Sequence, residues 1–277
     1  MEALSVTRKT FVKTVTSLLG TDSRLGKVLT GYEKLQEAKY ISHHFSNFLE
    51  PVVAETNDVK NQSFNIRHKV YCEELGFEPI QKNGLEIDEF DKYSSPCLIK
   101  HKRTETYAGT VRLVRPSKEQ DLLPIEKFCL NSITHKTLNP TNFARKDICE
   151  ISRLAVPKEF RKRQMDKFNG AALGIINEKT YSENELRCFP FIAVGLYFSA
   201  ASVILQNNIK HTYVMMEPRL ARSLRFIGIK FDQLGPIVDY HGQRAPFYIN
   251  PSLFYSSLRP SFGVMLRNIQ NQVKKQK

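Results

Sequence analysis

The sequence predicts an α/β or α+β protein built on a single sheet, with a helical extension at its N-terminus. From about residue 48, strand-like runs alternate with segments whose apolar residues recur at helical spacing. The chain has 277 residues, of which 41% are hydrophobic and 25% charged, as in ordinary globular domains. We find no internal repeat and no low-complexity tract. Strands and helices that alternate after an initial hairpin are typical of one sheet flanked by helices.

The N-terminal extension covers residues 1–45. Short helical segments are separated by glycines there, and the first of these segments is amphipathic. Basic residues interrupt that segment, so it lacks the apolar core of a signal peptide. We expect the main domain to span 46–250 and a helical, basic tail to follow at 251–277.

The elements of the main domain follow from local periodicity. Apolar spacing predicts two helices that end at Gly76 and Gly228, because glycine suits the left-handed position after a helix. Runs of β-branched residues bounded by turn residues predict the strands. In chain order we expect a strand at 48–56, a helix at 59–75, strands at 97–101, 107–115 and 149–156, helices near 164–180 and 191–207, a strand at 211–216, a helix at 219–228 and short strands up to 248.

The segment 188–209 carries no charge and is long enough to cross a bilayer. It also contains a proline, two serines, a glutamine and two asparagines, which lower its apolar content. These polar residues favour a helix buried in the protein core over a membrane span.

The cysteines indicate a reducing compartment. Five cysteines form no C-x-x-C pair, and their odd number fits a reduced intracellular chain better than a disulfide framework. The histidines show no metal-ligand spacing with acids or cysteines, so we expect no metal site. We expect a cytoplasmic protein and leave open a peripheral contact at the inner face of the membrane.

The charge is strongly positive and unevenly distributed. Lys and Arg number 41 against 28 Asp and Glu, which gives a formal net charge of +13. Composition alone permits nucleic acid, anionic membrane or an acidic protein as the partner. Residues 153–169 are rich in basic side chains, including Arg161, Lys162 and Arg163, whereas 73–91 are rich in acidic ones. A solvated surface is the plainer interpretation of an isolated basic triplet.

Arginines and carboxylates, rather than a familiar catalytic motif, carry the chemical signal. We find no nucleophile elbow, no zinc-protease motif, no Walker loop and no dinucleotide-binding glycine motif. Arg112 lies inside an apolar strand, where a buried guanidinium needs a carboxylate partner. Asp88 and Asp91 can supply that partner. A surface ion pair is the alternative interpretation of any one of these residues.

Several motifs occur together in a fixed order. They are R-x-x-V-Y from Arg67, L-G-F at 75–77, E-x-D-x-x-D over 86–91, G-T-x-R-L-V over 109–114 and E-x-S-R-L-A-V over 150–156. This series resembles the acyl-homoserine-lactone synthases and their relatives, the long-chain N-acyl amino acid synthases. A closer resemblance is to the acyltransferases associated with PEP-CTERM/exosortase systems, at VYCEELGFEP, LPIEKFC, EISRLAVPKEFRKR, MEPRLARSLRFIGI and GPIVDYHGQRAPF. The resemblance runs from about Phe48 to Tyr248.

The resemblance implies the fold of the GCN5-related N-acetyltransferases, with a mixed, mainly antiparallel sheet flanked by helices. In such folds the strand at 149–156 splays from its neighbour, and an acyl thioester enters the gap so that a backbone N–H polarises its carbonyl. Glu150 matches the family's proposed base, which takes a proton from the amine nucleophile. A structural role, in which Glu150 holds Arg153 or Arg112, is equally open.

The resemblance also assigns roles to the other polar residues. Ser152 and Arg153 join Glu150 in the catalytic group, although a strand serine that only bonds to the backbone is the plainer interpretation. Five residues match the family's buried charged cluster and are expected to position the cleft and the amine substrate: Arg67, Asp88, Asp91, Arg112 and Arg153. His241 is a candidate second acid or base, or a structural donor beside Gly242.

The acyl donor is expected to be an acyl carrier protein. Members that use acetyl-CoA carry a glycine-rich loop after this strand, which cradles pyrophosphate. Residues 157–169 contain no glycine and include Arg161, Lys162 and Arg163. A basic patch suits an acidic carrier protein that delivers acyl-phosphopantetheine. Acyl-CoA is the less favoured donor, since pyrophosphate also binds arginine.

The sequence therefore predicts an N-acyltransferase that moves a medium or long acyl chain to the amine of an amino acid or similar small molecule, with no bound cofactor. The helix at 191–207 and the strand at 211–216 are candidate walls for the acyl chain, although core packing is the default. Acyl-homoserine-lactone synthesis is the alternative reaction. A non-catalytic basic module that binds nucleic acid or anionic membrane is the alternative of another class. In the enzyme interpretation, no nucleic-acid partner is expected.

Overall fold

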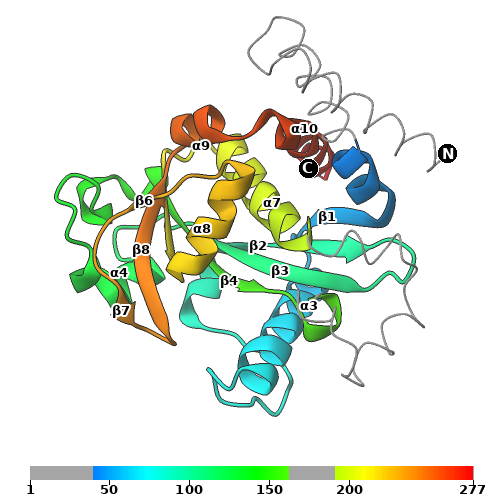
Figure 1. The fold of residues 1–277 in the computed structure, drawn as a ribbon. Coiled ribbons are helices and arrows are strands. Elements are labelled where there is room, and N and C mark those ends of the chain that lie inside the picture. Colours follow the sequence, from blue (N-terminus) through cyan, green and yellow to red (C-terminus); the bar gives the residue numbers. More distant parts are fainter. Residues whose placement is uncertain (1–39, 162–190, 277) are drawn as a thin grey trace, which may run out of the picture.

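A twisted sheet forms the centre of the protein (Figure 1). The structure, a computed structural model, describes residues 40–161 and 191–276. Within these residues the strand order is β1-β2-β3-β4-β5-β8-β6, and β7 pairs with β8. The strands are β1 (Leu49–Val53), β2 (Ser94–His101), β3 (Tyr107–Val114), β4 (Ile148–Ala155), β5 (His211–Met216), β6 (Asp232–Gln233), β7 (Val238–Asp239) and β8 (Gln243–Ile249).

The sheet is mixed and mainly antiparallel, as the sequence predicts. Among the described strands, β4 and β5 form the parallel pair and the other pairings are antiparallel. A parallel pair requires a crossover, and α7 (Ile192–Gln206) lies between β4 and β5 in the chain. The strand expected at 211–216 matches β5, and the other long strands begin or end within three residues of their predicted bounds.

Helices cover both faces of the sheet. On one face, α7 packs against β2 and β3, and a helical stretch at 40–48 contributes the buried Phe45. On the other face, α3 packs against the same two strands, and α4 covers a second apolar cluster that includes Tyr213. The helices other than α7 are α3 (Asn57–Arg67), α4 (Pro124–Cys129), α8 (Pro218–Ile227), α9 (Pro251–Ser257) and α10 (Pro260–Lys274).

The uncharged segment of the sequence is a core helix. Most of the side chains of α7 are buried, and the helix packs against α10 as well as the sheet (Figure 1). Over the described part of the chain, no helix has both the length and the apolar content that a membrane crossing requires. The helix expected near 164–180 and most of the predicted extension at 1–45 lie outside the described residues.

The helix predicted at 59–75 consists of two parts. After α3, residues His68–Glu74 form a π-helix, named η1, in which the Leu75 N–H donates to the Val70 carbonyl. Tertiary hydrogen bonds accompany this wider turn, since the Tyr71 hydroxyl donates to the Leu154 carbonyl at 2.8 Å. Apolar spacing does not distinguish a π-turn from an α-turn, so the sequence predicted one continuous helix.

Strands β4 and β5 separate part of the way along their length. Their pairing covers three positions and ends at Glu150 opposite Tyr213, although β4 continues to Ala155 and β5 to Met216. On its other side β4 bulges, because Thr110 pairs with Ala155 while Arg112 pairs with Ser152. The splayed strand that the family resemblance implies is therefore present, and Glu150 lies at the point of separation.

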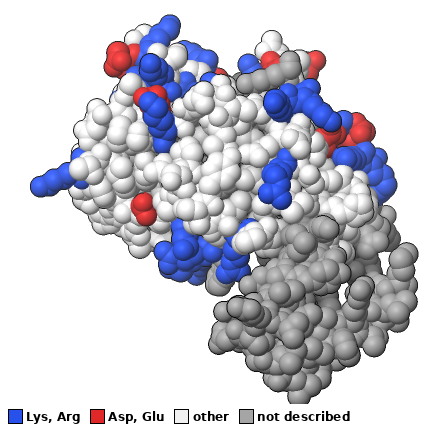
Figure 2. All heavy atoms as spheres, turned by 90° about the horizontal axis from the view of Figure 1, so that it is seen from above, with Lys and Arg blue, Asp and Glu red and all other residues white. Residues whose placement is uncertain are grey.

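Basic side chains predominate on the face of the protein that Figure 2 displays. Blue Lys and Arg side chains are spread around a broad uncharged area on this face, and few acidic side chains are visible there. On this face the described basic side chains are therefore dispersed and do not form one patch.

Two glycine substitutions test the packing around α7. A β-carbon added at Gly195 would lie 2.7 Å from two ring carbons of the buried Phe45, whereas one added at Gly263 in α10 would meet only Arg267 Nη1, at 3.7 Å. We expect Gly195→Ala to lower the free energy of unfolding by about 1–3 kcal/mol through overpacking. Gly263→Ala should instead raise it by about 0.4–1 kcal/mol. Urea unfolding of both variants measures this, and a stability gain from Gly195→Ala would contradict the packing described.

Candidate active site

Three arginines and four carboxylates interlock on the α3 face of the sheet. We refer to them as the arginine–carboxylate cluster; its members are Arg67, Glu78, Glu86, Asp88, Asp91, Arg112 and Arg153. The cluster joins α3, the loop at 75–88, the short 3₁₀ helix η2 (Glu89–Tyr93), β3 and β4. Five chain segments are thus held together by charge-assisted hydrogen bonds.

Asp91 is the shared acceptor of the cluster. The guanidinium of Arg67 binds it through two hydrogen bonds, Nη1 to Oδ1 at 2.7 Å and Nη2 to Oδ2 at 3.0 Å. Arg67 also donates from Nε to Glu86. A second guanidinium, that of Arg112, approaches Asp91 Oδ1 to 3.2 Å. Side chains of Arg67 and Arg112 are 0% and 1% exposed, so both charges depend on these partners.

Arg112 reaches from β3 to three different groups. Its Nη1 donates to Asp88 Oδ1 at 2.5 Å, and its Nε donates to the Ser152 hydroxyl oxygen at 3.0 Å. The sequence-based expectation that Asp88 and Asp91 pair with the strand arginine is therefore confirmed. Ser152 contacts an arginine side chain, rather than only the backbone as the plainer interpretation had it, because β3 places Arg112 directly opposite it.

Arg153 occupies the bulge of β4. Its φ of 50° lies in the left-handed region, which is uncommon for a residue with a side chain. The bulge directs its guanidinium toward the loop at 75–88, where Nη2 lies 2.9 Å from Glu78 Oε1 and 3.0 Å from Glu86 Oε1. The guanidinium also stacks over the ring of Tyr71.

The cluster keeps its acids ionised. Burial on its own favours the neutral acids, but Arg67 and Arg153 outweigh it and hold the pKa of Glu86 below its ordinary value. For Asp91, burial is likewise outweighed, chiefly by the hydrogen bonds and charge of Arg67, and the pKa is lowered. Because both pKa values are lowered, the ionised acids stabilise the folded state at pH values above their ordinary pKa. This stabilisation is lost as the pH falls through the lowered pKa.

Glu150 occupies a different environment, although it belongs to the same strand. Its side chain, 2% exposed, lies on the α4 face, and its Oε2 accepts a hydrogen bond from the Ile125 N–H at 2.7 Å. The part of the chain described here contains no ion pair between Glu150 and either Arg112 or Arg153. The direct contact of Glu150 is therefore with the first turn of α4, not with an arginine.

Burial dominates the ionisation of Glu150. It raises the pKa of the carboxyl from 4.5 to about 8, against the opposing effects of the Ile125 N–H and the Arg112 charge. Between pH 4.5 and 8 the folded chain keeps this proton while the unfolded chain loses it. The contribution of Glu150 to the free energy of unfolding is therefore fully present below pH 4.5 and is lost as the pH rises through about 8. A carboxylate with a raised pKa is a stronger base than an ordinary glutamate.

The first turn of α4 is itself fixed by a buried ion pair. Arg145 holds Glu126 through two hydrogen bonds, at 2.6 and 2.9 Å, and Glu126 Oε2 accepts the Leu123 N–H at 2.8 Å. These contacts orient the Ile125 N–H toward Glu150. Glu126, Arg145 and Ile125 had no predicted role, because their relation to Glu150 depends on long-range packing. The motif LPIEKFC, which contains Ile125 and Glu126, was the one sequence feature that marked this segment.

The hairpin that joins β7 and β8 carries His241 toward the loop at 75–88. His241 has a φ of 50° and its ring centroid lies 5.5 Å from that of Phe77 and 4.9 Å from that of Tyr240. Its imidazole is exposed and packs against aromatic rings at this position. The hairpin and the loop after η1 thus meet on the side of the sheet that holds Glu150.

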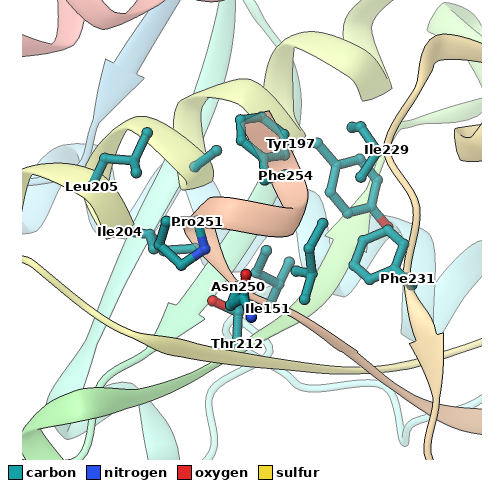
Figure 3. A pocket seen from close by; sticks show the side chains of 12 residues that line it. Ile151, Tyr197, Ile204, Leu205, Thr212, Ile229, Phe231, Asn250, Pro251 and Phe254 are labelled. Atoms are coloured by element: carbon teal, nitrogen blue, oxygen red, sulfur yellow. The ribbon is translucent and has the colours of Figure 1, made fainter. Parts of the chain in front are cut away.

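An apolar pocket opens on the opposite face, beside the point where β4 and β5 separate (Figure 3). About 30 Å³ of it is free for water-sized groups, so it is a narrow apolar recess, far smaller than a preformed small-ligand site. Tyr197 and Ile204 of α7, Ile151 of β4, and Phe254 of α9 are among its walls. Val214 and Met216, expected as walls, pack in the buried core instead, because their strand is covered there.

The predicted carrier-binding residues are only partly described. Arg161 forms an ion pair with Glu74, while Lys162 and Arg163 lie outside the described residues. Within the described residues, no group of three or more His, Cys, Asp or Glu side chains is arranged to hold a metal ion. The cluster carboxylates are instead engaged by arginines.

Comparisons with known proteins agree with this fold. Residues 66–169 match the family model of the acetyltransferase (GNAT) domain. The crystal structure of TofI in a ternary complex with an inhibitor and MTA is 14% identical, has a TM-score of 0.54, and is matched over 76% of this chain and 98% of that chain. No match was found among curated proteins.

Two further structures have lower TM-scores. FeeM, an N-acyl amino acid synthase from uncultured soil microbes, has a TM-score of 0.49 at 13% identity, over 77% of this chain and 96% of that one. BjaI, a CoA-dependent acyl-homoserine lactone synthase with SAM and isopentyl-CoA, has a TM-score of 0.49 at 15% identity, over 82% of this chain and 89% of that one. The fold assignment rests on TofI, and with the family match it supports an acyltransferase with a GNAT-like fold.

One substitution tests the cluster. Asp91→Asn removes the charge that Arg67 and Arg112 share, and we expect it to lower the free energy of unfolding by about 3–5 kcal/mol, because two buried guanidiniums lose a partner. The matched control is Glu89→Gln in the same 3₁₀ helix, whose ion pair with Lys127 is exposed and should contribute about 1 kcal/mol or less. Denaturant unfolding at neutral pH compares the variants, and equal losses would refute the anchoring role of Asp91.

Proposed function

We propose that the protein transfers a medium or long acyl chain from acyl-phosphopantetheine to the amine of an amino acid or similar small molecule. The observation that carries this proposal is the position of Glu150, a buried carboxyl with a raised pKa at the point where β4 and β5 part. A base is needed there because the amine is protonated near neutral pH and attacks only after losing a proton.

The proposed reaction is aminolysis of the thioester. Ionised Glu150 accepts the proton of the ammonium group, directly or through a water molecule, and the free amine attacks the thioester carbonyl. N–H groups of β4 beyond Glu150, which are not paired with β5, are the candidate donors to the oxyanion. The C–S bond then breaks as the amide forms. One proton goes to the departing thiolate and one is released to solvent.

The remaining residues position the reactants. The arginine–carboxylate cluster fixes β3, β4 and the loop at 75–88 relative to one another, and we assign Arg67, Asp88, Asp91, Arg112 and Arg153 this role. Ser152, held by Arg112, is the nearest strand hydroxyl to Glu150 along β4. The apolar pocket beside Ile151 is the proposed entrance for the acyl chain, which would have to widen it, because the pocket begins one residue from the base on the opposite face.

We propose an acyl carrier protein as the donor partner, through Arg161, Lys162 and Arg163. This part rests on the basic sequence and on the absence of glycine at 157–169. The resemblance to acyltransferases of PEP-CTERM/exosortase systems is likewise a proposal drawn from motifs. Neutralising the three basic residues while assaying acyl carrier protein and acyl-CoA side by side distinguishes the two donors.

Glu150→Gln tests the base. We expect this variant to lower turnover by about 10²- to 10⁴-fold while nearly preserving shape. In the wild type kcat/KM should rise with pH with a midpoint near pH 8 and level off above it, because the ionised carboxylate is the active form. The variant should lose this dependence and keep only that of the amine. The control is Glu119→Gln, an exposed glutamate remote from Glu150 in sequence.

Mass spectrometry of lipid extracts from expressing cells identifies the product. New N-acylated amino acids with the wild type, absent with Glu150→Gln, support the proposal and name both substrates. An N-acyl-homoserine lactone in the same extract would support the alternative reaction. If neither forms, and purified protein with long-chain acyl carrier protein or acyl-CoA plus mixed amino acids also gives no product, the enzyme proposal fails and salt-sensitive polyanion binding becomes the next test.

A further inference from the structure

Arg244 lies at the start of β8, on the face of the sheet that holds Glu150. Paired residues share a face, and the pairs Glu150–Tyr213 and Tyr213–Tyr248 place Glu150 and Tyr248 on the same side. Arg244 precedes Tyr248 by four residues in the same strand, so its side chain leaves the sheet on that side as well. Arg244 immediately precedes Ala245, which pairs with Met216, the last residue of β5. At Met216 the strand β5 is no longer paired with β4.

One donor of the partly exposed Arg244 side chain lacks an acceptor. Its Nε is buried without a hydrogen-bond partner, and no ion pair of this arginine occurs among the described residues. The three cluster arginines, by contrast, each bind at least two acceptors. Leaving a buried donor unpaired is costly, and an arginine fork matches a carboxylate in geometry and charge. An incoming carboxylate would satisfy this donor.

Neighbouring groups place Arg244 close to the reaction centre. Burial raises the pKa of the Cys129 thiol to about 11, Glu150 adds to this effect and Arg244 opposes it, so both charges act on one thiol. Burial likewise raises the pKa of Tyr71, and the charges of Arg153 and Arg244 oppose it. The hydroxyl of Tyr71 donates to the carbonyl of Leu154 in the unpaired part of β4. The charge of Arg244 thus acts both on a thiol that Glu150 also affects and on the tyrosine that binds the unpaired part of β4.

We infer that Arg244 binds the carboxylate of the acceptor, so that the acceptor is an α-amino acid with a free carboxyl group. This inference rests on the proposed function and specifies its substrate class. The amine and the carboxylate of an α-amino acid are attached to one carbon atom. Glu150 takes the proton from the amine, and Arg244 on the same face holds the carboxylate, which fixes the nitrogen for attack. Arg244 is thus a binding residue that determines specificity.

Pairs of substrates that differ only in the carboxyl group test this assignment. The wild type, Arg244→Gln and Arg244→Lys are assayed with dodecanoyl carrier protein and a panel of L-amino acids, each beside its primary amide. We expect the wild type to prefer the acids, and Arg244→Gln to raise the KM for acids by about 10- to 100-fold while the amides and the donor KM are unaffected. Arg244→Lys should restore part of the preference, since it keeps the charge and loses the fork.

Arg222→Gln is the matched control, because it removes one exposed arginine from α8 and should leave all constants unchanged. If Arg244→Gln retains the wild-type preference for acids over amides, or raises the donor KM instead, the assignment of Arg244 is overturned while the proposed function stands. If the wild type acylates no amine at all, both are overturned. Circular dichroism and urea unfolding of each variant identify any loss of folding, and Arg244→Lys then provides the same comparison in a more conservative variant.

Discussion

The sharing of Asp91 by Arg67 and Arg112 is the interaction on which the rest of the site depends. Arg67 ends α3, Arg112 lies in β3, and Asp91 belongs to the 3₁₀ helix that leads into β2. Two fully buried guanidiniums are tolerated because carboxylates surround them. The same network reaches Arg153 through Glu86, so the bulge of β4 and the loop at 75–88 are held in one arrangement. Removing one charge from such a network leaves the remaining charges buried without a compensating partner.

Carboxyl groups in this protein ionise differently according to their neighbours. Glu86 and Asp91 are buried beside arginines, and their pKa values are lowered. Glu150 is buried beside an amide N–H and apolar groups, and its pKa is raised to about 8. Acids whose environments separate their pKa values in this way take different roles in enzymes. The cluster acids are suited to hold structure, and Glu150 is suited to exchange a proton.

Patterns local to the chain made much of the fold predictable. β-branched runs identified β3, β4 and β5, and Gly228 was correctly placed as the end of α8, where its φ is 94°. An arginine inside an apolar strand predicted its own carboxylate partners, because burial leaves a guanidinium few alternatives. The roles of these residues in catalysis were drawn from a family resemblance and stay predictions.

Features that depend on distant parts of the chain were not predictable. The π-turn of η1 and the bulge at Arg153 are accompanied by contacts that cross between elements, and the contact of Ile125 with Glu150 joins residues separated by 25 positions. In the sequence Arg244 belongs to the motif GPIVDYHGQRAPF and has no other signal, since the missing partner of its Nε is visible only in three dimensions.

The central claim is that burial at the separation of β4 and β5 makes Glu150 a base matched to an amine. The most direct test is a ¹³C NMR titration of the glutamate side-chain carboxyls, with the Glu150 resonance assigned by its absence in Glu150→Gln. We predict a midpoint near 8 for this carboxyl. A midpoint near the ordinary glutamate value of about 4.3 would contradict it, because Glu150 would then be a weak base.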